Sequence, residues 1–306
     1  MTYDTFKQDL LALLQKRMGD TMHISTKEFL KNNNLKLDGL IMTDSKVNIS
    51  PTIYLNYYYD LYKDGTCTLD EICNKIITCY KKYELNNDFD ISLFTDFENV
   101  RDNIVFKLIN FEQNRTLLER IPHVKYLDLA IIFYYHLPYN SVISDLTNDV
   151  EASIQISKEH LDHWNVCLDD IFKLAKINTP KIFPAAVQPL ADVINEMLEA
   201  EGLQYPEIEL DDFTIYMVSN QSRYNGASTI LYQDLLQECA QKFDRDLIII
   251  PSSIHEILYL PKTDDIDLDH ITQMVKSVNE TEVALEDILS DHAYLYDRKK
   301  HELICA

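Results

Sequence analysis

Glycine is scarce in this chain, and the scarcity excludes the commonest nucleotide-binding sites. Only five of the 306 residues are glycine, and no two of them are closer than twenty positions. Dinucleotide-binding and phosphate-binding loops need clustered glycines, because the backbone must approach a phosphate closely. Rossmann, Walker and kinase-type loops are therefore excluded. The HExxH, GxSxG and EF-hand patterns are absent from the sequence as well, so it implies no cofactor and no metal.

Cysteine is present but follows no metal-binding or disulfide pattern. None of the six cysteines forms a Cys-x-x-Cys pair, and six over this length do not make a disulfide framework. We interpret most of them as reduced, packed thiols. They are Cys67, Cys73, Cys79, Cys167, Cys239 and Cys305.

Long hydrophobic runs are lacking too. Residues 127–137, which include Asp128 and His136, form one of the longest apolar runs, and it is far shorter than a membrane-spanning helix. Residues 2–18 have apolar side chains at helical spacing, but charged residues interrupt them, unlike a signal peptide. We therefore expect a cytoplasmic protein that spans no membrane.

Positive charge is the last shortage. The chain has 28 Lys and Arg against 50 Asp and Glu, a net charge of −22. This charge disfavours phosphate backbones and anionic lipid, so direct nucleic-acid binding and membrane docking are not expected. The simplest interpretation is a well-solvated surface. Two sharper alternatives are a basic protein partner and a decoy that imitates nucleic acid.

The remaining composition is that of a globular protein, and its patterning predicts an α+β fold. Hydrophobic residues make up 46% of the chain and charged residues 25%. We predict two mixed α/β subdomains, residues 1–145 and 146–306, with the boundary near 138–150. The C-terminal one reads as a β-α-β-β-α-β-β sheet with helices on one face. Residues 125–137 fit a strand or a helix equally well.

The individual elements follow from periodicity, caps and turn residues. Residues 31–34, Lys-Asn-Asn-Asn, predict the turn of a hairpin, and Thr68 with Glu71 predicts a capping box. Residues 99–119 mix helical spacing with polar breaks. Helices are predicted at 2–18, 68–83, 158–176, 187–200, 228–243 and 267–278, and strands at 23–30, 35–43, 213–219, 247–250, 257–260, 293–296 and 302–305.

The strongest candidate site lies between the strands predicted at 247–250 and 257–260. Ser252, Ser253, His255 and Glu256 place hydroxyls, an imidazole and a carboxylate in the connecting turn. These groups suit a ligand or partner site, a hydrolase centred on His255, or a turn in which they bond only to neighbouring backbone. Because serine and histidine two or three positions apart diverge in a turn, the sequence assigns no catalytic residue.

A second group could bind a soft metal. His160, His163 and Cys167 are spaced along one face of the helix predicted at 158–176. Three ligands from one helix rarely complete a tetrahedral site, however. We therefore favour a helix that buries Trp164 and satisfies one histidine.

Two further groups have both a functional and a plain interpretation. His123 and Asp128 could form an acid/base pair, or a loop histidine and a capping aspartate. The tyrosines of residues 54–62 could stack bases or partners, but no Lys or Arg interleaves them, which favours core packing.

Acidic residues are concentrated in two clusters. Residues 182–222 contain no Lys or Arg, and a second cluster follows at 264–269. Calcium could use such carboxylates, but the EF-hand loop is missing, so we favour solvated faces. The acids are Asp192, Glu196, Glu199, Glu201, Glu207, Glu209, Asp211 and Asp212, then Asp264, Asp265, Asp267 and Asp269.

Residues along the whole chain resemble an uncharacterised family of bacterial proteins of about this length, known only as a domain of unknown function. The resemblance implies an intracellular bacterial protein with no known cofactor, and it brings no activity. The residues that carry it are Lys31-Asn32-Asn33, Leu37, Gly39, Leu40, Ser50-Pro51-Thr52-Ile53-Tyr54-Leu55, Tyr58, Gly65, Leu108-Ile109-Asn110, Asn114, Pro122-His123, Asp128-Leu129-Ala130, His160-Leu161, Trp164, Leu174-Ala175, Asn178-Thr179-Pro180, Phe183-Pro184, Gly226-Ala227, Pro251-Ser252-Ser253-Ile254-His255-Glu256, Leu289-Ser290-Asp291 and Tyr296.

These observations lead to one leading hypothesis and two alternatives. The first is a non-enzymatic interaction protein that binds a protein partner, for which a basic protein is one option, through an acidic, tyrosine-rich surface. The second is an acidic nucleic-acid mimic that inhibits a basic DNA- or RNA-binding protein. The third is a hydrolase centred on His255.

Overall fold

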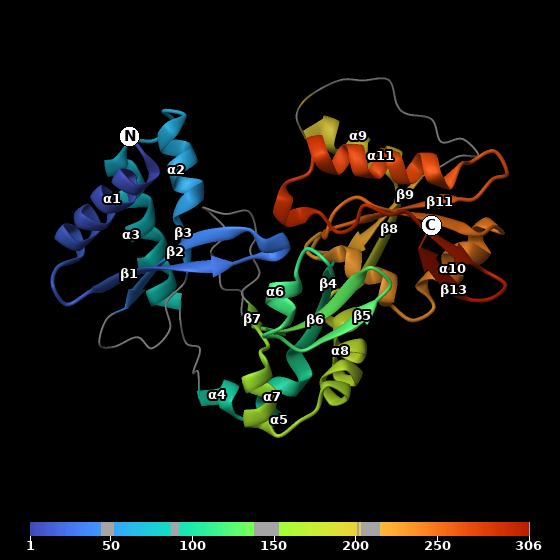
Figure 1. Ribbon diagram of the computed structural model, residues 1–306, viewed down its shortest axis with the longest axis horizontal. Coiled ribbons are helices and arrows are strands. Elements are labelled where there is room, and N and C mark those ends of the chain that lie inside the picture. The colour runs from blue at the N-terminus through green and yellow to red at the C-terminus, as the bar shows by residue number, and fades with distance from the viewer. Residues whose placement is uncertain (44–51, 87–91, 138–152, 201, 203–214, 306) are drawn as a thin grey trace. The chain divides into compact units, whose positions relative to one another are not determined.

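The computed structural model describes residues 1–43, 52–86, 92–137, 153–200, 202 and 215–305. It confirms the α+β prediction, with helices packed around antiparallel sheets (Figure 1). The chain forms two compact units. Unit 1 contains residues 1–31, 35–100 and 136–154, and unit 2 contains residues 32–34, 101–135 and 155–306.

Unit 1 is a three-stranded antiparallel sheet, in the order β1-β2-β3, with helices. The hairpin and the N-terminal helix lie where the sequence predicts them. The capping box is also confirmed, because Thr68 N donates to Glu71 Oε2 (2.8 Å) and Glu71 N donates to Thr68 Oγ1 (3.3 Å). Its elements are α1 (Tyr3–Met18), β1 (His23–Leu30), β2 (Lys36–Thr43), β3 (Ile53–Tyr54), α2 (Leu55–Lys63), α3 (Leu69–Asn86), α4 (Ser92–Thr95) and α5 (Phe97–Val100).

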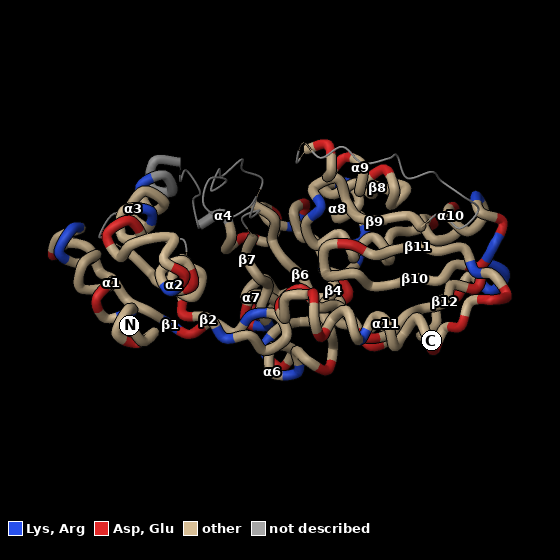
Figure 2. The backbone as a smooth tube through the Cα atoms, turned by 90° about the horizontal axis from the view of Figure 1, so that it is seen from above, with Lys and Arg blue, Asp and Glu red and all other residues tan. Residues whose placement is uncertain are grey.

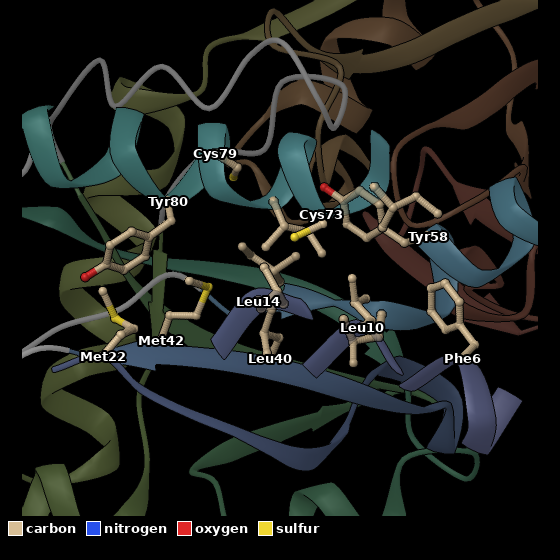
Figure 3. Close-up of a cluster of buried hydrophobic side chains, with 14 residues drawn as sticks. Phe6, Leu10, Leu14, Met22, Leu40, Met42, Tyr58, Cys73, Cys79 and Tyr80 are labelled. Atoms are coloured by element: carbon tan, nitrogen blue, oxygen red, sulfur yellow. The ribbon is translucent and has the colours of Figure 1, made fainter. Parts of the chain in front are cut away.

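The core of unit 1 lies between the sheet and its helices. Figure 3 shows Leu10 and Leu14 of α1 beside Leu40 of β2, with Cys73 of α3 above them. Tyr58 is buried in this core, and other tyrosines of α2 pack against it, so most of the tyrosine cluster supports the fold. Among residues 54–62, Tyr57 is the exposed tyrosine.

Unit 2 contains two antiparallel sheets. The larger has six strands in the order β13-β12-β10-β11-β9-β8, and the other contains β4, β6 and β5 in that order. None of the described helices has the length and apolarity to cross a membrane. The elements are η1 (Asn32–Asn34), η2 (Arg101–Asn103), β4 (Ile104–Asn110), α6 (Arg115–Leu118), β5 (His123–Tyr126), β6 (Leu129–His136), α7 (Lys158–Trp164), α8 (Leu168–Ile182), β8 (Ala185–Pro189), α9 (Leu190–Ala200), β9 (Tyr216–Asn220), η3 (Gly226–Leu231), α10 (Leu235–Phe243), β10 (Leu247–Pro251), β11 (Ile257–Pro261), α11 (Leu268–Thr281), η4 (Leu285–Asp287), β12 (Tyr294–Asp297) and β13 (Glu302–Cys305). The short strand β7 (Ser153–Gln155) includes the point at which the chain passes from unit 1 to unit 2.

Successive side chains of the six-stranded sheet point to opposite faces. Both faces carry apolar side chains. Ile248 and Leu260 face α11, where they cluster with Val275. On the opposite face Tyr216 pairs in register with Tyr259, and the Tyr216 ring lies 4.6 Å from that of Phe243 in α10. Burial on both faces explains why β10 and β11 read as continuous apolar runs.

The compact units do not follow a single cut of the chain. We expected domains of residues 1–145 and 146–306, whereas residues 101–135 cluster with the C-terminal part. The reason is the contact between β4 and α8. Phe106 N donates to Thr179 Oγ1 (3.0 Å), and Asn178 Nδ2 donates to Ile104 O (3.1 Å). The expected boundary at 138–150 lies outside the described residues.

The single helix predicted at 158–176 is wrong. It is two helices, because Asn165 has φ 53° and ends α7 in a left-handed cap. The predicted end at residue 176 is wrong as well, since α8 continues through Pro180 to Ile182. Thr179 Oγ1 donates to Ala175 O (2.7 Å) and accepts from β4, so tertiary contacts hold a helix that proline would weaken.

Strand pairing resolves two stretches that the sequence leaves ambiguous and shortens one predicted helix, and another predicted helix is divided. The ambiguous stretch 125–137 and the helical spacing before residue 110 both become strands of the β4-β6-β5 sheet. The helix predicted at 187–200 starts at Leu190, because β8 pairs with β9 up to Pro189. The helix predicted at 228–243 is instead η3 followed by α10.

Two buried tyrosines on one face of the six-stranded sheet provide a matched pair. Tyr294 is 1% exposed, and its hydroxyl donates to Asp128 Oδ1 (2.8 Å). Tyr259 is 0% exposed, and its hydroxyl has no hydrogen-bond partner among the described residues. Burial raises the pKa of both phenols well above 10. Both hydroxyls therefore keep their protons and stay uncharged over the whole physiological pH range.

We expect Tyr294→Phe and Tyr259→Phe to change stability in opposite directions. The first removes one of the two hydroxyl donors to the Asp128 carboxylate and should lower the free energy of unfolding by about 2 kcal/mol. The second removes a desolvated hydroxyl and should raise it by about 1 kcal/mol. Urea unfolding monitored by the fluorescence of Trp164, the one tryptophan and a residue of unit 2, measures both. Equal losses in the two variants would contradict the assignment.

Candidate functional site

The turn at residues 252–256 connects β10 to β11, as the sequence predicts. Antiparallel pairing runs up to Pro251 and Ile257, which leaves five residues in the turn. Ser253 N donates to Glu256 O (3.1 Å), and Ser252 Oγ donates to Glu256 Oε1 (3.2 Å). His255 N donates to Ser253 Oγ (3.0 Å). The two serines and the glutamate therefore bond within the turn.

The His255 ring points out of the turn and bonds through both nitrogens. Asn225 N donates to Nδ1 (3.2 Å), so the proton of the neutral ring lies on Nε2. Nε2 then donates to Asp287 Oδ1 (3.2 Å). The ring of Tyr224 lies 5.4 Å away, and His255 and Asp287 are both half-buried. The imidazole thus connects the start of η3 to η4.

Gly226 allows η3 to approach this turn. A Cβ there would lie 2.5 Å from His255 O and 2.0 Å from Ser219 Oγ, which are closer than any side chain tolerates. The two atoms themselves are hydrogen-bonded, with Ser219 Oγ donating to His255 O (2.7 Å). Ala227 N also donates to Ile254 O (3.2 Å). The close approach of backbones therefore requires glycine at this position.

The other half of the site is the segment of residues 285–291. Only its first three residues are helical, as the short η4, so most of its carbonyls need partners from elsewhere. Asn33 Nδ2 donates to Leu285 O and to Ile288 O, both at 2.7 Å, and Asn32 Nδ2 donates to Glu286 O (2.6 Å). Ile254 N donates to Asp287 O (2.8 Å).

A buried amide holds Asn33 in place. Asn114 is fully buried, and its Oδ1 accepts from Asn33 N (2.8 Å) while its Nδ2 donates to Asn33 Oδ1 (2.9 Å). Asn33 has φ 56°, a left-handed conformation that asparagine tolerates. Asn110 Nδ2 extends the network to Leu289 O (3.2 Å).

Asp128 and Ser290 complete the network. Asp128 accepts from Ser290 Oγ (2.6 Å) and from the hydroxyl of Tyr294 (2.8 Å). Asn279 Nδ2 donates to Ser290 O (2.9 Å) and Asp291 Oδ1 (2.8 Å). The segment 285–291 is thus bonded from the turn of η1, from β4, from the start of β6 and from α11.

Many of the residues that carry the family resemblance meet in this network. Asn33, Asn114, Asp128 and Ser290 are among them, although no sequence pattern groups them into a site. Asp287, the partner of His255, was missed altogether. Neither periodicity nor motif spacing could have found these residues, because amide-to-carbonyl bonds leave no local pattern.

The candidate metal ligands do not converge. His160 and His163 lie on α7, whereas Cys167 is the N-cap of α8 beyond the break at Asn165. Ser157 N donates to His160 Nδ1 (3.0 Å), and Cys167 Sγ donates to Asp170 Oδ2 (3.0 Å). Within the described part of the chain, no three histidine, cysteine or acidic side chains form a group that could hold a metal ion.

The suggested acid/base pair of His123 and Asp128 is not formed. The two residues stand at opposite ends of β5 and its turn. His123 Nδ1 donates to Ile121 O (3.2 Å), while Asp128 bonds to Ser290 and Tyr294. The aspartate has a structural partner rather than a catalytic one.

Only part of the acidic clusters lies among the described residues. Glu196 pairs with Arg223 (3.4 Å). In the second cluster Asp267 caps α11 by accepting from Asp269 N (3.0 Å). Glu201, Glu207, Glu209, Asp211 and Asp212 lie outside the described residues.

Replacing Asn33 should test the hold on the segment 285–291. Asn33→Ala leaves the carbonyls of Leu285 and Ile288 without their donor and strains a left-handed residue, so we expect the free energy of unfolding to fall by about 3 kcal/mol. Asn34 is exposed and also left-handed, with φ 60°. Asn34→Ala is therefore the control for strain alone and should lose about 1 kcal/mol. If urea unfolding gives the two variants the same loss of free energy of unfolding, Asn33 does not hold the segment 285–291.

The capping histidine of α7 should make stability depend on pH. Burial lowers the pKa of His160 below 6.5, and its neutral Nδ1 accepts from Ser157 N. The unfolded chain binds a proton at His160 more tightly than the folded chain does. The free energy of unfolding therefore keeps the full contribution of this cap above about pH 6.5 and falls as the pH drops toward the lower pKa of the folded state. His160→Gln keeps the cap without titrating. In thermal melts between about pH 7 and 5, the melting temperature of this variant should fall less steeply than that of the natural chain. An equally steep fall would contradict the role of His160.

Comparison with known proteins places the chain in a family. The model of a family of unknown function, DUF5688, matches residues 3–298 and so covers both units. No curated protein and no solved structure matches the chain. The match confirms the family resemblance seen in the sequence and adds no activity to it. The chain belongs to DUF5688, a family of unknown function.

Proposed function

We propose that this is a cytosolic bacterial protein that catalyses no reaction and binds a basic protein partner. The proposal rests on the way in which the His255 ring is hydrogen-bonded. Its two ring nitrogens bond to Asn225 N and to Asp287, and these bonds fix η3 and η4 to the turn after β10. The most reactive side chain of the candidate site therefore positions backbone segments.

The same geometry weighs against a hydrolase centred on His255. A general base needs one ring nitrogen that faces the nucleophile while the other is oriented by an acid. Here Asp287 bonds to Nε2, but Nδ1 faces a backbone N–H instead of a hydroxyl. The nearby Ser252 donates to Glu256 and has no bond to the imidazole.

The charge of the chain indicates the kind of partner. A net charge of −22 favours association with basic polypeptides and speeds their encounter. Figure 2 shows acidic residues on helices, on turns and on some strands, while the strands β10 and β11 carry none. The local bonds of Glu196 and Asp267 fit a general acidic surface better than a phosphate-like array. The proposed surface does not include the tyrosine cluster, because most of its side chains pack in the core of unit 1.

A pull-down at two salt concentrations tests the proposal. The full chain is immobilised and exposed to nuclease-treated bacterial lysate, and retained proteins are eluted with high salt and identified. We expect a basic protein that then binds the purified chain saturably by calorimetry, with affinity falling as salt rises. Recovery of no saturable partner at low ionic strength would refute it.

Competition with duplex DNA separates this proposal from nucleic-acid mimicry. A mimic occupies its partner's DNA site, so DNA would displace the chain from the recovered protein. We expect DNA to leave the complex intact. Displacement by equimolar DNA would overturn the simple partner proposal in favour of mimicry.

A further inference from the structure

The second half of α11 and the turn after it expose an unusual share of apolar surface. Eight large hydrophobic side chains are exposed among the described residues, and three of them fall within residues 274–285. Met274 and Val278 are both 44% exposed and lie one helical turn apart, and Leu285 is 48% exposed. Single exposed apolar residues need no explanation, whereas a group of them marks an interaction surface.

The turn that presents Leu285 is held in advance. Its backbone carbonyl accepts from Asn33 Nδ2 (2.7 Å), and the next two carbonyls accept from Asn32 Nδ2 (2.6 Å) and Ile254 N (2.8 Å). His255 binds the side chain of Asp287. A rigid turn that exposes a leucine loses little conformational entropy when a partner covers it.

The charge along this segment is mainly negative. Residues 268–287 contain five acids and a single lysine, Lys276. Glu280, Glu282 and Glu286 are exposed. Exposed apolar side chains on a segment that also carries exposed carboxylates complement a helix with an apolar stripe and flanking lysine or arginine. A second copy of this chain fits poorly, because each copy carries a charge of −22.

We propose that Met274, Val278 and Leu285, with the glutamates beside them, form the docking surface for a basic amphipathic helix of the partner protein. This inference rests on the proposed function and names the surface and the partner's chemistry. The hydrogen-bond network around Asn33 and His255 then has a functional purpose. It holds the end of the docking surface in its binding conformation.

Binding of two peptides tests the surface. One is a short helical peptide in which leucine and lysine alternate with helical spacing, and the other is its scrambled isomer with the same charge. Fluorescence anisotropy at physiological salt measures both against the full chain. We expect the amphipathic peptide to bind more tightly, and Val278→Ser with Leu285→Ser to weaken it about tenfold.

Ile177→Ser is the matched control, because Ile177 is 54% exposed on α8 and lies away from the surface in sequence. It should leave the affinity unchanged, and thermal melts confirm that each variant is folded. Equal affinities for all variants would overturn the docking surface while leaving a basic partner in place. Equal binding of the two peptides would also overturn it. If neither peptide binds, this docking surface is overturned, and the pull-down alone decides the proposed function.

Discussion

Buried side-chain amides that satisfy backbone carbonyls hold the central part of unit 2 together. The segment 285–291 has almost no regular structure, so its carbonyls have no helix or sheet partners. Asn33, Asn110 and Asn279 supply the donors, and Asn114 fixes Asn33 from both sides. Each buried carbonyl left without a donor would cost about 1–3 kcal/mol. The conformation of the candidate site depends on these bonds.

This constraint also explains the chemistry of the site. His255 and Asp287 form a pair that resembles part of a catalytic arrangement, yet Asn225 N occupies the nitrogen that a nucleophile would need. The pair joins three backbone segments, and Gly226 lets two of them approach closely. What emerges is a rigid, half-buried scaffold with an exposed leucine and carboxylates beside it, a combination suited to recognition.

Elements that depend on interactions between neighbouring residues could be predicted from the sequence, whereas elements that depend on distant contacts could not. The capping box at Thr68, the hairpin of β1 and β2, and the strands β10 and β11 depend on neighbouring residues and were all predicted correctly. The break at Asn165 was not predicted, although asparagine favours such a left-handed cap. The passage of α8 through Pro180 was not predicted either, because contacts with β4 decide whether that helix continues. Strands β4 and β8 have helical spacing in their sequences, and only pairing with distant strands reveals them.

The sequence alone determined the α+β class, the family, the acidic charge and the exclusion of glycine-loop nucleotide sites, because composition and local patterns are sufficient for these. It also singled out Ser252, Ser253, His255 and Glu256, but it could not say what they bond to. Only the tertiary structure paired His255 with Asp287 and brought Asn33 to Ile288, 255 positions away. An asparagine that will bond a distant carbonyl looks the same in sequence as one in a solvent-exposed turn, so folding alone distinguishes them.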